Sequence, residues 1–161
     1  MAINITSVKN KVRNAINSNA QKAWRAKFES NIVEEAADEF IAVLKREIDS
    51  CGLDPEVASA IADSIEHDSP TKINSNKYSI NVQFSDDMTR PSLNPNDELN
   101  NLALLMNDGF SHTKHAVRGI WHGKEIIGLR ERDGKHFIES AILQFMNNYA
   151  RKYGVDEIKK D

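Results

Sequence analysis

Tyr78-Ser79-Ile80-Asn81-Val82-Gln83-Phe84 is the stretch that decides the fold, because its apolar and polar residues alternate strictly. Successive side chains of a β-strand point to opposite faces, so a period of two predicts a strand with one buried face. The longer segments before and after it repeat their apolar residues with the period of a helix. The sequence therefore predicts an α+β fold, with long N-terminal helices and a C-terminal helix packed on a small antiparallel sheet.

Two helices are predicted between residue 21 and this strand. Residues 21–50 carry one broad apolar face and one charged face, and Gly52 is placed to end that helix. A second helix should begin at Pro55, which suits the first helical position, with Asp54 as its cap. It should end near Ser69-Pro70, since a residue that precedes proline is driven out of the helical conformation.

The segment before residue 21 is polar and basic. Its apolar residues recur every four positions, which predicts a short helix over residues 6–20: Val8, Val12 and Ile16. The chain is accordingly expected to have three parts: a basic N-terminal helical segment (1–30), a single α+β domain (31–154) and a frayed tail (155–161).

The segment after the strand alternates loops with short elements. Residues 85–96 hold two Asp, two Pro and two Asn, and they are predicted to form a loop. Periodicity and turn residues predict the remaining elements: a helix over Asp97–Asn107 ended by Gly109, strands at Val117–Trp121 and Glu125–Arg130 around a turn at His122-Gly123-Lys124, and a last helix over Lys135–Tyr153 ended by Gly154.

Composition places the chain among ordinary globular proteins. Its 161 residues suit one domain, with 40% of them hydrophobic and 28% charged. No apolar run reaches the roughly 18 residues that a membrane span needs. The first residues lack the apolar core of a signal peptide, and Cys51 is the single cysteine. We therefore expect no internal disulfide and synthesis in a reducing cytoplasm.

The charges are distributed unevenly along the chain. Residues 1–30 hold six basic residues and one acidic residue, whereas residues 31–70 hold eleven acidic and two basic residues. A basic end and an acidic end favour head-to-tail stacking of copies, or docking on a partner ring. Two solvated helix faces would leave the same pattern, so the charge runs by themselves leave both interpretations open.

The sequence carries no signature of a known catalytic site. The phosphate-binding glycine loops and the GxSxG nucleophile elbow are absent. Four histidines would suit zinc, but they form no HExxH arrangement. His112, His115 and His122 lie in predicted loops and turns, and His136 lies near the N-terminus of the predicted last helix. Two acidic pairs would suit a divalent metal, although adjacent carboxylates more often cap backbone amides: Asp86-Asp87 and Asp97-Glu98. We expect no catalytic residue, no metal and no cofactor.

Aromatic residues and a long loop are the candidates for partner contact. Trp121 lies between two glycines of the predicted hairpin, where it either closes the edge of the core or anchors an interface. Trp24 lies in the basic segment without a clear buried face, which favours contact with a partner. The loop at residues 85–96 is expected to become ordered on assembly.

Six stretches follow one another in a recognisable order: Ile32–Ile48, Ala60–Ile65, Tyr78–Phe84, Leu104–Phe110, Gly119–Gly123 and His136–Ile142. Their Gly turn, their Trp-His-Gly hairpin and their Phe-Ile-x-x-Ala helix start resemble a family of small tail-component proteins of long-tailed double-stranded DNA phages. These proteins are related to tail-completion and head–tail joining proteins. The resemblance covers about residues 30–150. It departs from the family at His136, where the family has Pro, and at Ser69–Ile73, which lacks the family's Gly.

The resemblance implies assembly in the virion tail or neck after synthesis in the bacterial host cytoplasm. It implies a homo-oligomeric ring that contacts a head-side connector or head-completion protein and the major tail tube protein, with incidental contact to channel DNA and none to membranes. It implies no enzymatic activity. The residues that we expect at interfaces are Trp24, Arg25, Lys27, Arg90, Leu93, Phe110 and Trp121.

Two other functions stay open from the sequence. The basic N-terminal helix would suit a nucleic-acid-binding module, although the acidic helix that follows would repel phosphate. The histidines and aspartates of residues 86–136 would suit a small metal-dependent hydrolase or nuclease.

Overall fold

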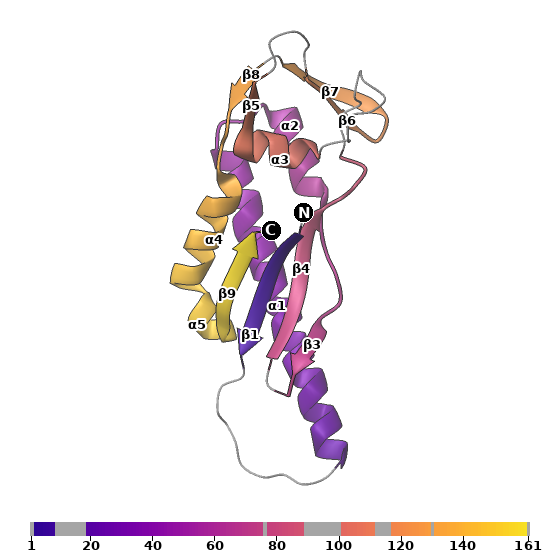
Figure 1. Cartoon of the computed structure of the whole chain (residues 1–161), viewed down its shortest axis with the longest axis vertical. Helices are drawn as coiled ribbons and strands as arrows, with labels where there is room; N and C mark the ends of the chain where they lie inside the picture. The colour runs from indigo at the N-terminus through magenta and orange to yellow at the C-terminus, as the bar shows by residue number, and fades with distance from the viewer. Residues whose placement is uncertain are drawn as a thin grey trace. The chain divides into compact units, whose positions relative to one another are not determined.

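The computed structural model describes residues 2–8, 19–75, 77–88, 101–111, 117–129 and 131–160 (Figure 1). Helices combined with an antiparallel sheet confirm the predicted α+β class. The chain divides into two compact units built from interleaved segments. We call them the sheet unit (Met1–Val43, His67–Gln83 and Ile142–Asp161) and the hairpin unit (Leu44–Glu66 and Phe84–Ala141).

The main sheet has five strands in the order β2-β4-β1-β9, with β3 also paired to β4. Strand β1 is antiparallel to both of its neighbours, β4 and β9. Strand β3 pairs with the first residues of β4 on one edge. Strand β1 pairs with β4 on its other edge. The bounds of the strands are β1 Ala2–Val8, β2 Ile65–His67, β3 Thr71–Asn74, β4 Lys77–Phe84 and β9 Val155–Lys160.

The two central strands put their apolar residues on one face. Ile3 lies opposite Val82 and Ile5 lies opposite Ile80, and all four side chains are buried. The other face is polar, and there the amide of Asn4 donates a hydrogen bond of 2.8 Å to the side-chain oxygen of Asn81. Strand β4 alternates buried and half-buried residues along its whole length, as its sequence predicts.

Two helical segments bury apolar residues within the sheet unit. Of helix α1 (Asn19–Ser50), the part up to Val43 passes behind β1 and β4 in Figure 1. The part of α4 (Phe137–Asn148) from Ile142 onward and the short α5 (Ala150–Tyr153) lie toward β9. The rings of Phe40 on α1 and Phe145 on α4 meet edge to face, with centroids 5.8 Å apart. The Tyr153 hydroxyl donates to Glu39 at 3.3 Å and also accepts from Lys152, which raises the pKa of that lysine.

The hairpin unit combines helices with two separate two-stranded sheets. Strand β5 pairs with β8, and β6 pairs with β7, both antiparallel. Its core includes Ile61, Met88 and Phe137, all buried. The bounds of its own elements are α2 Pro55–Asp63, α3 Leu102–Asp108, β5 Gly109–Ser111, β6 Val117–Trp121, β7 Lys124–Leu129 and β8 Glu131–Asp133.

A fully buried asparagine holds the start of α4 in this unit. The side-chain oxygen of Asn107 accepts a hydrogen bond from the backbone N–H of Ile138 at 2.8 Å. Its amide donates to Asp108 at 2.8 Å and to Glu139 at 2.9 Å, so both ends of the side chain are satisfied. The first N–H groups of a helix have no acceptor within the helix. Asn107, on the neighbouring α3, provides the acceptor for one of these groups, the N–H of Ile138.

The sequence prediction was wrong at the N-terminus of the chain. Residues 6–8, expected at the start of a helix, belong to strand β1, and residues 9–18 lie outside the described residues. Pairing with β4 on one edge and with β9 on the other outweighs the weak four-residue period of Val8, Val12 and Ile16. The N-terminal part is therefore a strand followed later by α1, and it is not helical throughout.

The predicted frayed tail is also corrected. Residues 155–160 form strand β9, which pairs with β1, and Val155 is buried. The last helix begins at Phe137 instead of Lys135 and is interrupted at Tyr149, after which α5 runs to Tyr153.

Helix α2 ends earlier than predicted. It stops at Asp63, where the buried hydroxyl of Ser64 donates back to the carbonyl of Ile61 at 2.8 Å. Ile65, which lies within the predicted helix, is instead part of strand β2. Helix α3 starts at Leu102 with Asn101 as its cap, and residues 97–100 of the predicted helix lie outside the described residues.

Removing residues 155–161 should destabilise the protein by about 2–4 kcal/mol, because β1 loses one of its two partner strands and Val155 leaves the core. Urea denaturation followed by circular dichroism measures this change. The full-length variant Asp156→Ala, which alters an exposed side chain of the same strand, is the control. An unchanged midpoint for the truncation would show that the tail contributes nothing to the fold.

Replacing Asn107 by Ala should cost about 2–4 kcal/mol of unfolding free energy, since it opens a cavity and leaves the Ile138 N–H without its acceptor. Asn148→Ala, at an exposed position of α4, the helix whose start Asn107 supports, should change the unfolding free energy by less than about 0.5 kcal/mol. Equal effects of the two substitutions would contradict the positioning role of Asn107.

Candidate partner-binding site of the hairpin unit

The β6–β7 hairpin presents two side chains from one face. Its strands are joined by His122 and Gly123, with φ values of 48° and 75°, which is the backbone of a tight type I′ turn. Trp121 and Lys124 are directly paired across the two strands. Because opposite residues of an antiparallel pair point to the same face, Trp121 and Lys124 project together.

Helix α2 provides the facing surface. Asp54 caps the helix by accepting the backbone N–H of Glu56 at 3.0 Å, and Pro55 occupies the first helical turn. Val57, Ala58 and Ile61 are buried in the core of the unit. The exposed residues Glu56, Ser59 and Asp63 are three and four positions apart, so they share one face of the helix.

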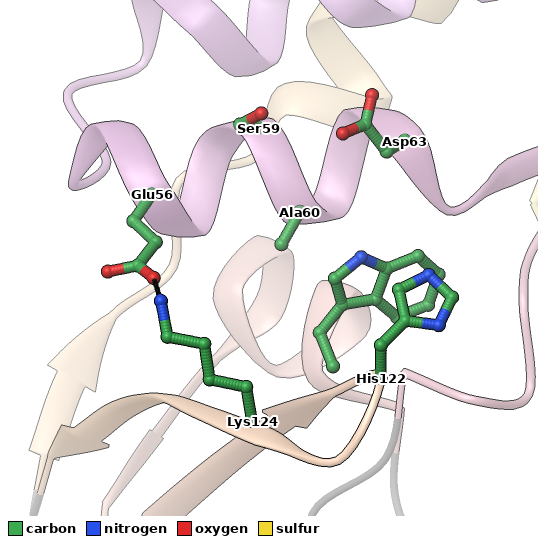
Figure 2. Close-up of a pocket in the computed structure, with 7 residues that line it drawn as sticks. Glu56, Ser59, Ala60, Asp63, His122 and Lys124 are labelled. Carbon is green, nitrogen blue, oxygen red and sulfur yellow. Dashed lines mark hydrogen bonds and ion pairs between the residues drawn. The ribbon is translucent and has the colours of Figure 1, made fainter.

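The two surfaces enclose an open hollow of about 450 Å³ (Figure 2). Ala60 has no side chain beyond its Cβ and leaves room between the helix and the hairpin. Lys124 reaches across the hollow and forms an ion pair with Glu56. The residues that line the hollow are Glu56, Ser59, Ala60, Asp63, Trp121, His122 and Lys124.

The hollow has an aromatic surface and one carboxylate, that of Asp63, which is not neutralised by the ion pair of Lys124 with Glu56. The half-buried indole of Trp121 lies against the imidazole of His122, with ring centroids 4.2 Å apart and planes inclined by 51°. Lys124 neutralises Glu56, while Asp63 has no ion-pair partner among the described residues. An aromatic face and an uncompensated carboxylate in the lining of one hollow suit a cationic side chain of a partner.

The structure places the predicted interface residues in different parts of the chain. Trp121 lies in the hollow, and Lys27 is exposed on α1 in the sheet unit. Trp24 and Arg25 belong to α1 and Phe110 belongs to β5, but their side chains are outside the described part of the structure. Arg90 and Leu93 lie outside the described residues altogether.

Sequence reasoning missed the helical half of the site. Glu56, Ser59 and Asp63 were not singled out, although their spacing on the polar side of a predicted helix places them on one face. The contact between α2 and β7 could not be predicted, because the two elements lie more than 60 positions apart in the chain.

The histidines and acidic pairs considered as metal ligands are not brought together among the described residues. Within the described residues, no three side chains of His, Cys, Asp or Glu converge as a metal site would require. His112, His115 and the pair Asp97-Glu98 lie outside the described residues, whereas His122 lines the hollow and His136 is exposed. None of the described helices is both long and apolar enough to cross a membrane.

Comparison with known protein families, curated proteins and solved structures finds no match to this chain.

The ion pair in the hollow should contribute little to stability, because the side chains of Lys124 and Glu56 are 71% and 52% exposed. Glu56→Gln should lower the free energy of unfolding by less than about 1 kcal/mol, as should Lys124→Ala. Thermal or urea denaturation of both variants measures this, with Asp133→Asn, an exposed carboxylate of β8, as the control. A loss of several kcal/mol would show that the pair is a structural latch of the hairpin.

Proposed function

We propose that this chain is a non-enzymatic structural protein of the virion that acts at the head–tail joint of a long-tailed DNA phage. It works by protein–protein contacts and assembles as a homo-oligomeric ring between a head-side protein and the tail tube. The support comes from the family resemblance of its sequence and from the kind of surface that the hairpin unit carries.

The observation that carries the proposal is the β6–β7 hairpin. It forms a two-stranded sheet of its own, separate from the five-stranded sheet, and isolated hairpins are marginally stable in water. It is held beside α2 by contacts of β7 and by the exposed pair of Lys124 with Glu56. A weakly held hairpin with a half-buried Trp121 at its tip is well suited to gain order from a partner, and tryptophan is enriched at the energetic centres of interfaces.

Three of the motifs behind the resemblance lie in the hairpin unit. Gly109, at a φ of 83°, caps α3, and the Trp-His-Gly triplet forms the tip of the hairpin. Phe137 and Ala141, from the Phe-Ile-x-x-Ala stretch, are buried at the start of α4.

The nucleic-acid alternative has less support. Strand β1 carries no charged residue, and Lys9, Lys11 and Arg13 lie outside the described residues. On α1, the exposed Lys27 is followed by exposed acidic residues at Glu35 and Asp38, which would repel a phosphate backbone.

Sedimentation or light scattering of the purified chain at low and high salt tests the proposal. We expect an oligomer, or an equilibrium between monomer and oligomer, that shifts toward monomer as added salt screens the charges. Trp121→Ala should weaken this association, whereas Leu143→Ala, which removes an exposed apolar side chain of α4, should leave it unchanged. A monomer at every concentration, combined with salt-dependent DNA binding, would favour the nucleic-acid alternative.

A further inference from the structure

We propose that the hollow between α2 and the β6–β7 hairpin receives the ammonium group of Lys27 from a second copy of this chain. The inference rests on the proposed function and deepens it, because it names both surfaces of the contact between copies. Asp63 would pair with the incoming charge, and the indole of Trp121 would pack against its aliphatic stem.

The receiving surface lies in the most acidic part of the chain. Between Arg46 and Lys72 the sequence holds seven acidic residues and no lysine or arginine. Lys124, contributed by the hairpin, is already paired with Glu56. Asp63 is exposed and has no ion-pair partner among the described residues, so the hollow keeps a net attraction for a cation.

The aromatic component makes the hollow more than a charged patch. A lysine or arginine side chain combines an apolar stem with a cationic end. The half-buried Trp121 offers an apolar and π-electron surface, and Asp63 offers the counter-charge within the same hollow of about 450 Å³. This combination recognises a basic side chain, whereas an anion would meet two carboxylates.

The donor surface lies on α1. Lys27 is exposed, and its neighbour Phe28 is 51% exposed, which is unusual for so large an apolar side chain. Residues 1–30 carry a net charge of +5, from six basic residues and Glu29. A cation beside an exposed aromatic ring forms a surface complementary to the hollow, whose lining includes both Asp63 and Trp121.

Donor and receptor are different surfaces of the same chain. Lys27 belongs to the sheet unit and Asp63 to the hairpin unit. A contact between unlike surfaces of identical copies is either reciprocated, which gives a closed dimer, or repeated head-to-tail, which generates a ring when the rotation closes. The inferred contact is therefore compatible with the proposed ring, which needs the head-to-tail arrangement.

Complementary charge reversal tests the contact. Asp63→Lys and Lys27→Glu should each raise the Kd of self-association at least about tenfold, because each places like charges in the contact. Mixing the two variants in equal amounts should restore association to near the wild-type Kd. In the mixture, every contact joins either the two native partners or the two reversed ones, and the double variant should recover in the same way. Sedimentation equilibrium at low salt measures all four samples.

Matched controls separate this contact from a change in net charge. Asp156→Lys on β9 and Arg151→Glu on α5 reverse exposed charges elsewhere, and neither should alter the Kd more than about twofold. Urea denaturation checks that every variant is folded.

The outcomes distinguish the inference from the proposed function. If the wild-type chain associates and Asp63→Lys behaves like Asp156→Lys, or if the mixture fails to recover, the inferred contact is wrong and assembly uses another surface. If the wild-type chain does not associate with itself under any condition, the homo-oligomeric ring is wrong as well.

Discussion

The antiparallel pairing of β1 with β4 is the constraint on which the sheet depends. It places Ile3 against Val82 and Ile5 against Ile80, so that a continuous apolar surface forms on one face. A shift of one residue would turn this entire set toward the polar face, where Asn4 and Asn81 now bond to each other. The buried isoleucines and the paired asparagines therefore specify the same register from opposite sides of the sheet.

The parts of the fold that follow from local periodicity could be predicted. Strand β4 alternates without interruption over its eight residues, and α1 begins within two residues of its predicted start. Strand β1 was missed because the alternation of Ile3 and Ile5 is short, while Val8, Val12 and Ile16 fit a helical spacing.

Strand β9 was missed because its pairing with β1 is irregular. The register against β1 shifts between Thr6 and Ser7, so Val155 and Ile158 align with odd-numbered residues of β1 although they are three positions apart. Such an irregularity removes the period of two that identifies a strand.

The candidate site divides in the same way. Trp121 and the hairpin turn could be found from the sequence, because a His-Gly turn flanked by apolar residues is a local signal. The acidic residues of α2 could not be assigned to the same site, since the contact of α2 with β7 is a product of tertiary packing. Asn107 belongs to this class too. Its sequence context at the end of a short helix gives no sign that it is fully buried and supports the first turn of α4.

The sheet also has a bearing on how the protein is made. Strand β1 leaves the ribosome well before its partner β9, because Ile3 pairs with Lys160, which is synthesised 157 positions later. Its pairing with β4 can form once residue 84 has emerged, but its other edge stays open until β9 arrives. During that interval the nascent chain exposes unpaired backbone groups beside two isoleucines, a surface to which other strands can add. The slowest step of folding is therefore expected to be the closing of the sheet, when β1 and β9 pair across this long sequence separation.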